Sequence, residues 1–489
     1  MLAIIFISML VPMLVMGLPM VGSYAMAFLV PCLLSGQEVF RLSDLVGWLA
    51  AGAGKDTYVA IALFVISGEL MSKGRLTERI FDIFAYLFGN FRSCFPLVAV
   101  MTSLFYGMIS GSGIAVVAAV GCMVLPYLVE LGYDVVFFAA MLACAGSLGQ
   151  LIPPSGAILQ TVAMMEDVNA TECFKVAMVM GLVCSLFLLV MTILHCRKDG
   201  GDRAKIEEKV KELRAKGFGR VFADSIWALL CPAIILGGIF TNIFTTAEAA
   251  AVSVVYGLFV GMVIYREVKL KDLFDICVDS AKTTGGIMLI VASASLFSYV
   301  CTKFGIADAA SALLGSIAHN QFTFLLIVNI IFLIAGCFID ANSAMYIFIP
   351  VMLPVCKALG YDVVAFGVMA TVNLAIGQVT PPVGVNLFVA IGIKIKKGME
   401  VTLQEISKAV MPMLAACVAV LLVVTYIPVT STALPRALAK NGAYSGDSSS
   451  GDSGSSAASA AGDGDYSFNE IADYSDLDWE ETTWNFACS

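Results

Sequence analysis

Two short polar segments interrupt long apolar stretches, and both carry oxygen atoms that can bind a cation. The first is Gly-Met-Ile-Ser-Gly-Ser-Gly at 107–113, and the second is Gly-Cys-Phe-Ile-Asp-Ala-Asn-Ser at 336–343. Hydroxyl, amide, carboxylate and freed backbone oxygens are hard ligands, which suit an alkali cation and not a soft metal. Asp340 ends an apolar run, where a carboxylate is costly unless it is paired. We interpret Asp340 as a cation ligand, with a helix cap at the membrane interface as the alternative.

Each polar segment precedes one copy of a duplicated sequence. Residues 125–156 and 353–384 align without a gap at an offset of 228 residues (353 − 125), with 15 identities in 32 positions. Both copies keep Gly-Gln and then Pro-Pro, at 149–154 and 377–382. Proline inside a helix costs about 3 kcal/mol or more, so each helix should break there. Paired broken helices indicate the midplane binding site of a secondary transporter, whereas the alternative is a structural helix that is merely kinked.

Composition predicts the class of protein. Hydrophobic residues make up 60% of the chain, charged residues 13%, and the mean hydropathy is +0.92. A soluble domain has about 25% charged residues, so we expect a helical protein that crosses the membrane several times. His-Glu-x-x-His, Gly-x-Ser-x-Gly and P-loop motifs are absent, which argues against an enzyme and against ATP hydrolysis by this chain. Nothing in the sequence indicates a nucleic-acid partner.

The distribution of basic residues predicts how the helices are oriented in the membrane. The segment 196–220 holds nine Lys and Arg residues, and smaller basic clusters follow other apolar runs, so the positive-inside rule places all of them in the cytoplasm. Both termini then lie outside, and the two halves are inverted repeats. The predicted domains are a first repeat at 1–195 with a re-entrant hairpin at 95–125 and a broken helix at 134–165, a basic cytoplasmic linker at 196–223, a second repeat at 224–430 with a hairpin at 323–350 and a broken helix at 363–393, and an acidic disordered tail at 431–489.

Other expected elements complete each half. We expect helices near 2–16, 18–34, 57–72 and 172–195 in the first half, and near 224–244, 246–265, 272–300 and 403–427 in the second. The segment 75–92 has apolar residues at helical spacing on one side, which suits a helix lying in the membrane interface or one packed on the protein. Its counterpart is expected at 305–319. After Lys440 the chain has ten acidic and no basic residues, which is typical of disorder, with a docking segment as the alternative.

Several ordered stretches resemble one known family over residues 1 to about 430. LVMGLPM (14–20), GMISGSG (107–113), FTTAEAAAV (244–252), DANSA (340–344) and NLAIGQVTPPVGVNLFVA (373–390) are similar to the large membrane subunit of tripartite ATP-independent periplasmic (TRAP) transporters. The resemblance implies an elevator-type transporter of the bacterial inner membrane that is driven by sodium. It implies as partners a small four-helix membrane subunit, a periplasmic solute-binding protein and a small organic anion. Apart from sodium as coupling ion, no cofactor is expected.

The resemblance also implies site residues. Sodium sites would lie at the hairpin tips and at the facing breaks, on Ser110, Gly111, Ser112, Gly149, Pro153, Asp340, Asn342, Gly377, Thr380 and Pro381. No Lys or Arg lies within the tips or breaks, so anion binding must depend on helix N-termini, backbone N–H groups and bound sodium. The predicted substrate contacts are Ser112, Pro154, Asn342, Pro382 and Asn386. The alternatives are a stand-alone sodium–anion symporter of the same architecture and an accessory membrane protein without coupled transport.

Overall fold

The structure is a computed structural model, which describes only part of the chain. The described residues are 22, 25–30, 56–89, 91, 93–165, 168–198, 201–241, 243–303, 320–338, 341–393 and 401–427, without the side chains of 56–57, 291, 294–303 and 342–343. The helix expected at 2–16, the segment at 305–319 and the tail at 431–489 lie outside these residues. So does most of the helix expected at 18–34, of which residues 22 and 25–30 are described and helical.

The described part of the chain is helical and contains no strand. Within that part, six helices are long and apolar enough to cross a membrane, which confirms the prediction of an all-α polytopic protein. The helices are α4 (Asp56–Lys73), α5 (Leu76–Phe88), α6 (Cys94–Ser110), α7 (Gly113–Glu130), α8 (Val135–Gly149), α9 (Gly156–Met164), α10 (Ala170–Lys198), α11 (Arg203–Ala215), α12 (Phe218–Phe240), α13 (Thr246–Phe259, continued by a π-helical turn at Val260–Ile264), α14 (Leu270–Lys303), α16 (Gln321–Phe338), α17 (Ala341–Ala358), α18 (Val363–Gly377), α19 (Val385–Ile391) and α20 (Leu403–Tyr426).

The duplicated sequence forms the same local structure twice. The Asp134 carboxylate accepts a hydrogen bond from Val136 N at 3.0 Å and caps α8, and Asp362 accepts one from Ala365 N at 3.0 Å and caps α18. Aspartate is among the strongest N-cap residues, which fixes where each apolar helix begins. Both helices end at the Gly-Gln pair, and a short second helix follows each Pro-Pro segment, as α9 and α19. Each copy is therefore a helix in two pieces.

Each broken helix follows a pair of helices. The first pair is α6 and α7, joined by a short tip at Gly111 and Ser112, and the second pair is α16 and α17, between which residues 339–340 lie outside the described part of the chain. Their second helices run beyond the expected ends at 125 and 350. Helix α7 continues through Pro126, and α17 continues through Pro350 and Pro354. A proline inside an apolar helix is tolerated where neighbouring groups satisfy the freed carbonyl, so these prolines do not end the helices.

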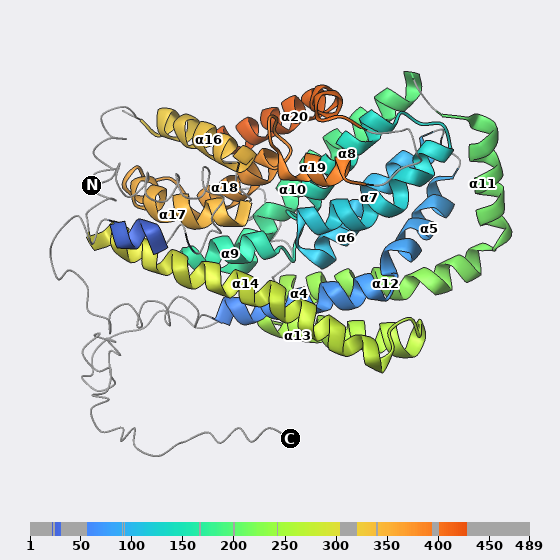
Figure 1. Cartoon of the computed structure of the whole chain (residues 1–489), viewed down its shortest axis with the longest axis horizontal. Coiled ribbons are helices and arrows are strands. Elements are labelled where there is room, and N and C mark those ends of the chain that lie inside the picture. Colours follow the sequence, from blue (N-terminus) through green and yellow to red (C-terminus); the bar gives the residue numbers. More distant parts are fainter. Residues whose placement is uncertain are drawn as a thin grey trace, which may run out of the picture. The chain divides into compact units, whose positions relative to one another are not determined.

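The two helix pairs and the two broken helices interlock (Figure 1). Helices α8 and α18 pack against their own pairs and against α10 and α20. The second pieces cross over, because α9 packs on α17 and α19 packs on α7. Helices α4, α12, α13 and α14 lie along one side of this group in Figure 1. Two sequence halves thus share one core, with the two breaks inside it.

Helices α4 and α13 run parallel. Gly257 faces Leu70, and four residues further along both helices Gly261 faces Gly74. Both helices therefore end at the same side, where basic residues follow each of them. There the Arg79 guanidinium lies 3.8 Å from the centre of the Tyr265 ring, and the Tyr265 hydroxyl donates to Asp224 O at 2.6 Å. These contacts connect the end of α13 to α5 and α12.

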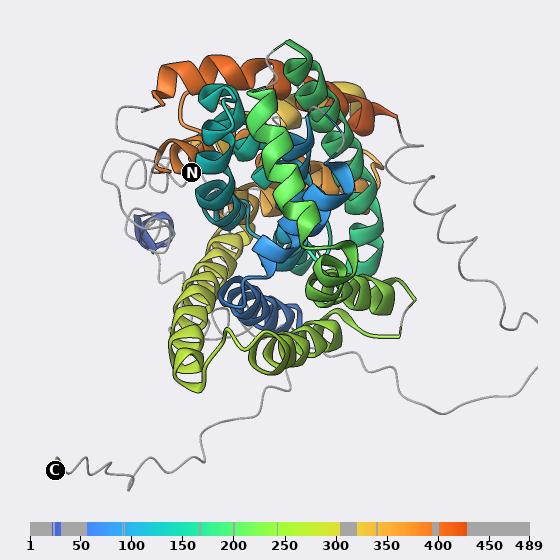
Figure 2. The ribbon, with the colours of Figure 1, turned by 90° about the vertical axis from the view of Figure 1, so that its right-hand side faces the viewer.

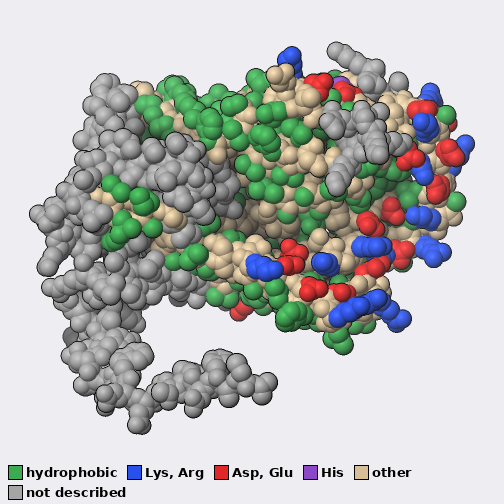
Figure 3. Space-filling view, viewed as in Figure 1, with side chains coloured by type: hydrophobic (Ala, Val, Ile, Leu, Met, Phe, Trp, Pro, Cys, Tyr) green, Lys and Arg blue, Asp and Glu red, His purple; other side chains and the backbone are tan. Residues whose placement is uncertain are grey.

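Charged side chains gather at this same end of the described helices, while hydrophobic side chains cover much of the remaining coloured surface (Figure 3). Helix α11 lies across the end, as Figure 2 shows with this side facing the viewer. Part of the segment 196–223, predicted as a basic linker, is this helix, and α12 begins within it at Phe218. Helix α5 buries Ile80, Ile83 and Phe84 and packs on α6, α11 and α12. Its buried residues are therefore covered by protein, whereas Leu87 in its last turn is exposed.

Candidate functional site

The tip between α6 and α7 is closed by its own residues. Gly111 has a φ of 62° and donates to Gly107 O at 2.8 Å, which ends α6. Glycine takes this left-handed conformation at little cost, so the chain can turn within two residues. The Ser112 hydroxyl accepts from Ala115 N at 3.4 Å and caps α7. A Cβ atom at Gly111 would lie 3.1 Å from Gly156 N, so the tip sits against the start of α9.

The two breaks meet each other through the equivalent glutamines of the duplicated sequence. Gln150 Nε2 donates to Gln378 Oε1 at 2.8 Å, and the two residues are 228 positions apart, which is the offset of the duplication. The Gln150 Oε1 atom accepts a hydrogen bond at 3.1 Å from the backbone N of Gly113, which is the first residue of α7. Equivalent residues of two copies touch one another only near the axis that relates the copies. The glutamine pair therefore marks the centre of the arrangement and joins it to the first tip.

Asn386 extends this cluster from the second break. Its Nδ2 atom donates to Ser147 Oγ at 2.7 Å and lies 3.4 Å from Gln378 Oε1. Asn386 is fully buried, and its Oδ1 atom has no hydrogen-bond partner among the described residues. A buried oxygen without a hydrogen bond destabilises the fold by about 1–3 kcal/mol. A bound ligand that pairs with this oxygen would remove that cost. We call Ser147, Gln150, Gln378 and Asn386 the amide cluster.

Close backbone contacts hold the helices around the amide cluster. A Cβ atom at Gly107 would lie 2.5 Å from Gly149 Cα, so α6 and α8 cross with their backbones in contact. The second half repeats this crossing, because a Cβ atom at Gly377 would lie 2.6 Å from Gly336 Cα in α16. Gly149 and Gly377 are the last residues of α8 and α18. Each break thus begins where its helix touches the first helix of the preceding pair.

The predicted site residues of the first half come together. Ser110, Gly111 and Ser112 form the tip, which is half-buried, and Gly149, Pro153 and Pro154 form the first break, which is buried. In the second half Gly377 is buried and Thr380 and Pro381 are half-buried, whereas Pro382 is exposed. Asp340 lies outside the described residues, and Asn342 falls in α17 without a described side chain. Both Pro-Pro peptide bonds, 153–154 and 381–382, are cis.

The second break is held to α16 by the backbone. Gly384 N donates to Cys337 O at 3.1 Å, and the Cys337 thiol donates to Thr380 O at 3.0 Å. The Thr380 hydroxyl donates to Ile376 O at 3.0 Å, a carbonyl in the last turn of α18. Thr380, a predicted sodium ligand, therefore has its hydroxyl proton engaged while its oxygen keeps a lone pair.

Helix ends and amide oxygens supply the electrostatics of the site. In the described part of the chain no three His, Cys, Asp or Glu side chains lie close enough to hold a metal ion. Helices α8 and α18 end at the breaks, and helix C-termini carry partial negative charge that favours a cation. Helices α7 and α9 begin beside them, and helix N-termini favour an anion. These groups can bind a hard cation and an organic anion side by side.

Sequence reasoning missed the partners of some of these residues. Ser147 contacts Asn386 across 239 residues, but its counterpart in the second copy is Ala375, so the duplication gave no signal for it. Gln150 and Gln378 are identical in both copies, which is the signal that could have identified the pair. Asn373, near the end of α18, donates to Asn329 Oδ1 in α16 at 2.8 Å, and its position beside the second break in the sequence gives no sign of this contact.

Comparison with known proteins assigns the family. The sequence model described as "Tripartite ATP-independent periplasmic transporter, DctM component" matches residues 1–430. The chain belongs to the DctM family. A DctM component is a transporter permease, so the prediction from the sequence motifs is confirmed at the level of the family.

Curated relatives agree with this assignment. The C4-dicarboxylate TRAP transporter large permease DctM of Pseudomonas aeruginosa is 34% identical over 78% of this chain and 86% of its own length. The sialic acid TRAP transporter large permease SiaM of Vibrio cholerae is 30% identical over 84% of this chain and 92% of its own. The isethionate TRAP transporter permease DctMQ of Oleidesulfovibrio alaskensis is 35% identical, and this chain spans 56% of its length.

Solved structures with the same fold are more distant in sequence. The YdaH transporter of Alcanivorax borkumensis superimposes with a TM-score of 0.54 at 14% identity, over 79% of this chain and 87% of its own. MtrF of Neisseria gonorrhoeae, described as one of a class of antimetabolite efflux pumps, gives a TM-score of 0.54 at 13% identity, over 78% and 83%. Because the sequence identity is this low, the likeness shows only that the chain shares the fold of these transporters.

Proposed function

We propose that this chain is the membrane permease of a sodium-driven importer of small organic acid anions, such as C4-dicarboxylates or sialic acid. A periplasmic solute-binding protein delivers the anion, and a small four-helix membrane subunit assembles with the permease in the bacterial inner membrane. The observation that carries the proposal is the amide cluster, in which two breaks and a tip meet around the unpaired oxygen of a fully buried asparagine, Asn386.

The chemistry of the site supports sodium as the coupling ion. Sodium prefers hydroxyl, amide and carbonyl oxygens, and the described tip and breaks offer these atoms with no soft ligand cluster. The sequence adds the carboxylate of Asp340 at the second tip. Each bound sodium brings positive charge, which attracts the organic anion in a site whose tips and breaks contain no Lys or Arg.

The names of the relatives support the class of substrate. They include a C4-dicarboxylate permease, a sialic acid permease and an isethionate permease, all of which are named for organic anions. Anions of this kind can be held by helix N-termini and backbone N–H groups together with sodium. Transport would proceed by an elevator movement, in which the two helix pairs and the two broken helices move together.

The test is uptake into proteoliposomes that contain this chain and its small subunit. A radiolabelled anion is presented with the cognate binding protein, under an inward sodium gradient or an equal potassium gradient. We expect accumulation above equilibrium with sodium and the binding protein, and none when either is left out. Equal uptake with potassium would contradict sodium coupling. Uptake without the binding protein would indicate a stand-alone symporter, and downhill flux alone would indicate an uncoupled membrane protein.

A further inference from the structure

Helix α11 lies at the surface of the described protein, with one side buried and the other exposed. It connects α10 to α12, both of which are long and apolar enough to span the membrane, and it lies across their ends (Figure 2). Ile206, Val210 and Leu213 are buried and form one stripe that packs on α5. The fit is tight, since a Cβ atom at Gly89 would lie 2.9 Å from Val210 Cγ1. Its other side chains are largely exposed, so α11 is a polar helix packed on the protein at the side where α10 ends and α12 begins.

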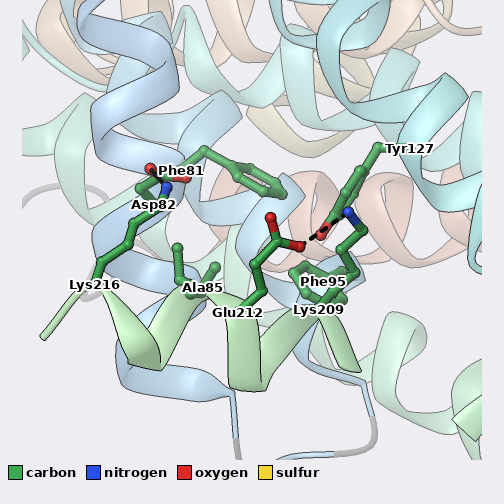
Figure 4. A pocket seen from close by; sticks show the side chains of 9 residues that line it. Phe81, Asp82, Ala85, Phe95, Tyr127, Lys209, Glu212 and Lys216 are labelled. Carbon is green, nitrogen blue, oxygen red and sulfur yellow. Dashed lines mark hydrogen bonds and ion pairs between the residues drawn. The ribbon is translucent and has the colours of Figure 1, made fainter. Parts of the chain in front are cut away.

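Two cavities flank the buried stripe of α11. The first, of about 200 Å³, lies between α11 and the aromatic rings of Phe81, Phe95 and Tyr127 (Figure 4). Its charges are balanced, because Lys209 pairs with Glu212 at 3.1 Å and Lys216 pairs with Asp82 at 3.4 Å. The hydrogen bond that Lys209 donates to Glu212 raises the pKa of Lys209, so this amine stays protonated. A cavity that neutralises its own charges has little attraction for an anion.

The second cavity, of about 400 Å³, has a different balance of charge. Arg203, Lys211 and Arg214 line it together with a single acid, Glu207, which pairs with Arg203 at 3.0 Å. Three positive charges against one negative charge leave a formal excess of two. Guanidinium and ammonium groups arranged around one cavity are the usual means by which proteins bind a phosphate.

The same cavity has an apolar edge. Phe91 lines it and is 59% exposed, and Leu87, in the last turn of α5, is 52% exposed. Phe91 lies on the connection from α5 to α6, and Leu87 lies just before it at the end of α5, outside the cavity lining. A free phosphate makes no use of such a surface, whereas the glycerol and acyl chains of a lipid would cover it. The combination of a cationic recess with an apolar edge at a membrane surface therefore favours a lipid.

We propose that this cavity binds the headgroup of an anionic phospholipid. The phosphate lies against Lys211, Arg214 and Arg203, and the acyl chains extend over Phe91 and Leu87 into the bilayer. Because α11 belongs to the connection between the two halves of the chain, a bound lipid fixes this connection to the membrane. The site is separate from the amide cluster and does not depend on which anion is transported.

The test is lipid binding to the full chain, purified and delipidated in a neutral detergent, by native mass spectrometry. Dioctanoyl phosphatidylglycerol, dioctanoyl phosphatidylcholine and inorganic phosphate serve as probes. We expect tighter binding of phosphatidylglycerol than of phosphatidylcholine, and no displacement by phosphate at equal concentration. The double variant K211Q/R214Q should weaken phosphatidylglycerol binding about 25-fold, at about fivefold for each basic side chain near a lipid headgroup.

The matched control is Lys205→Gln. Lys205 lies on the same helix but on the other side of the buried stripe, lines neither cavity and is exposed. It should leave phosphatidylglycerol affinity unchanged, so that a general effect of net charge is excluded. Equal weakening by Lys205→Gln, or unchanged binding in the double variant, would overturn the site. Displacement of the lipid by inorganic phosphate at equal concentration would overturn the assignment to a lipid.

Discussion

Replacing Gly107 by alanine should separate α6 from α8. The new Cβ atom would lie 2.5 Å from Gly149 Cα and 2.6 Å from Gly149 O, whereas carbon atoms in contact are about 3.5–4.0 Å apart. Both obstructing atoms are backbone atoms, so no rotamer change relieves the contact. The helices must move apart by about 1 Å, and overpacking of this kind costs about 1–3 kcal/mol. We expect a value near the upper limit.

The measurement is the Tm of the purified chain in detergent. Unfolding is detected by the reaction of a thiol reagent with cysteines that are buried in the folded protein. At roughly 2–4 °C for each kcal/mol, Gly107→Ala should lower the Tm by about 5 °C or more. Because the crossing lies beside the first tip and the first break, uptake per folded molecule should fall as well. The equivalent crossing predicts a similar loss of stability for Gly377→Ala, whose Cβ atom would lie 2.6 Å from Gly336 Cα.

The matched control is Gly237→Ala in α12. A Cβ atom there would meet nothing within 4 Å, so only helix propensity changes, and alanine is favoured over glycine by about 1 kcal/mol. Gly237→Ala should therefore leave the Tm unchanged or raise it slightly. If Gly107→Ala behaved like Gly237→Ala, the backbone contact between α6 and α8 would be wrong.

Three further predictions concern the ion, the amide cluster and the topology. Asp340→Asn should weaken apparent sodium affinity about a hundredfold, by analogy with loss of one charge from a buried pair, while a normal sodium titration would assign Asp340 to helix capping. Gln378→Leu leaves Gln150 Nε2 without its acceptor and should cost about 1–3 kcal/mol, seen as a lower Tm; an unchanged Tm would contradict the glutamine pair. In a Cys-free background, a cysteine at 450 should react with an impermeant reagent in intact spheroplasts and one at 211 only after permeabilisation; the reverse pattern would invert the topology.

The sequence predicted the broken helices because their signals are local. Proline pairs, glycines and the capping residues Asp134 and Asp362 act within a few residues of themselves, and the duplication repeats each signal. The ends of the helix pairs were predicted less well. The hairpins were expected to end at 125 and 350, but α7 continues through Pro126 to Glu130 and α17 continues through Pro354 to Ala358.

Contacts between distant segments could not be predicted in the same way. An apolar helix such as α8 is buried on nearly every side, so its sequence does not indicate which side faces the second break. The contact of Ser147 with Asn386 depends on that rotation. For the same reason the sequence does not distinguish Asn373 from Asn386. Both keep an Oδ1 atom without a hydrogen-bond partner among the described residues, but Asn373 donates to Asn329 in α16, whereas Asn386 donates to Ser147 in the amide cluster.

This pair of asparagines provides the most direct test of the transport site. Both are fully buried, so Asn386→Leu and Asn373→Leu remove the same amide from the same depth. The measurement is sodium-driven uptake in proteoliposomes, normalised to folded protein. We predict that Asn386→Leu lowers uptake at least tenfold with a near-normal Tm, whereas Asn373→Leu lowers the Tm and leaves uptake per folded molecule close to normal. Normal uptake by Asn386→Leu would contradict the assignment of the amide cluster as the transport site.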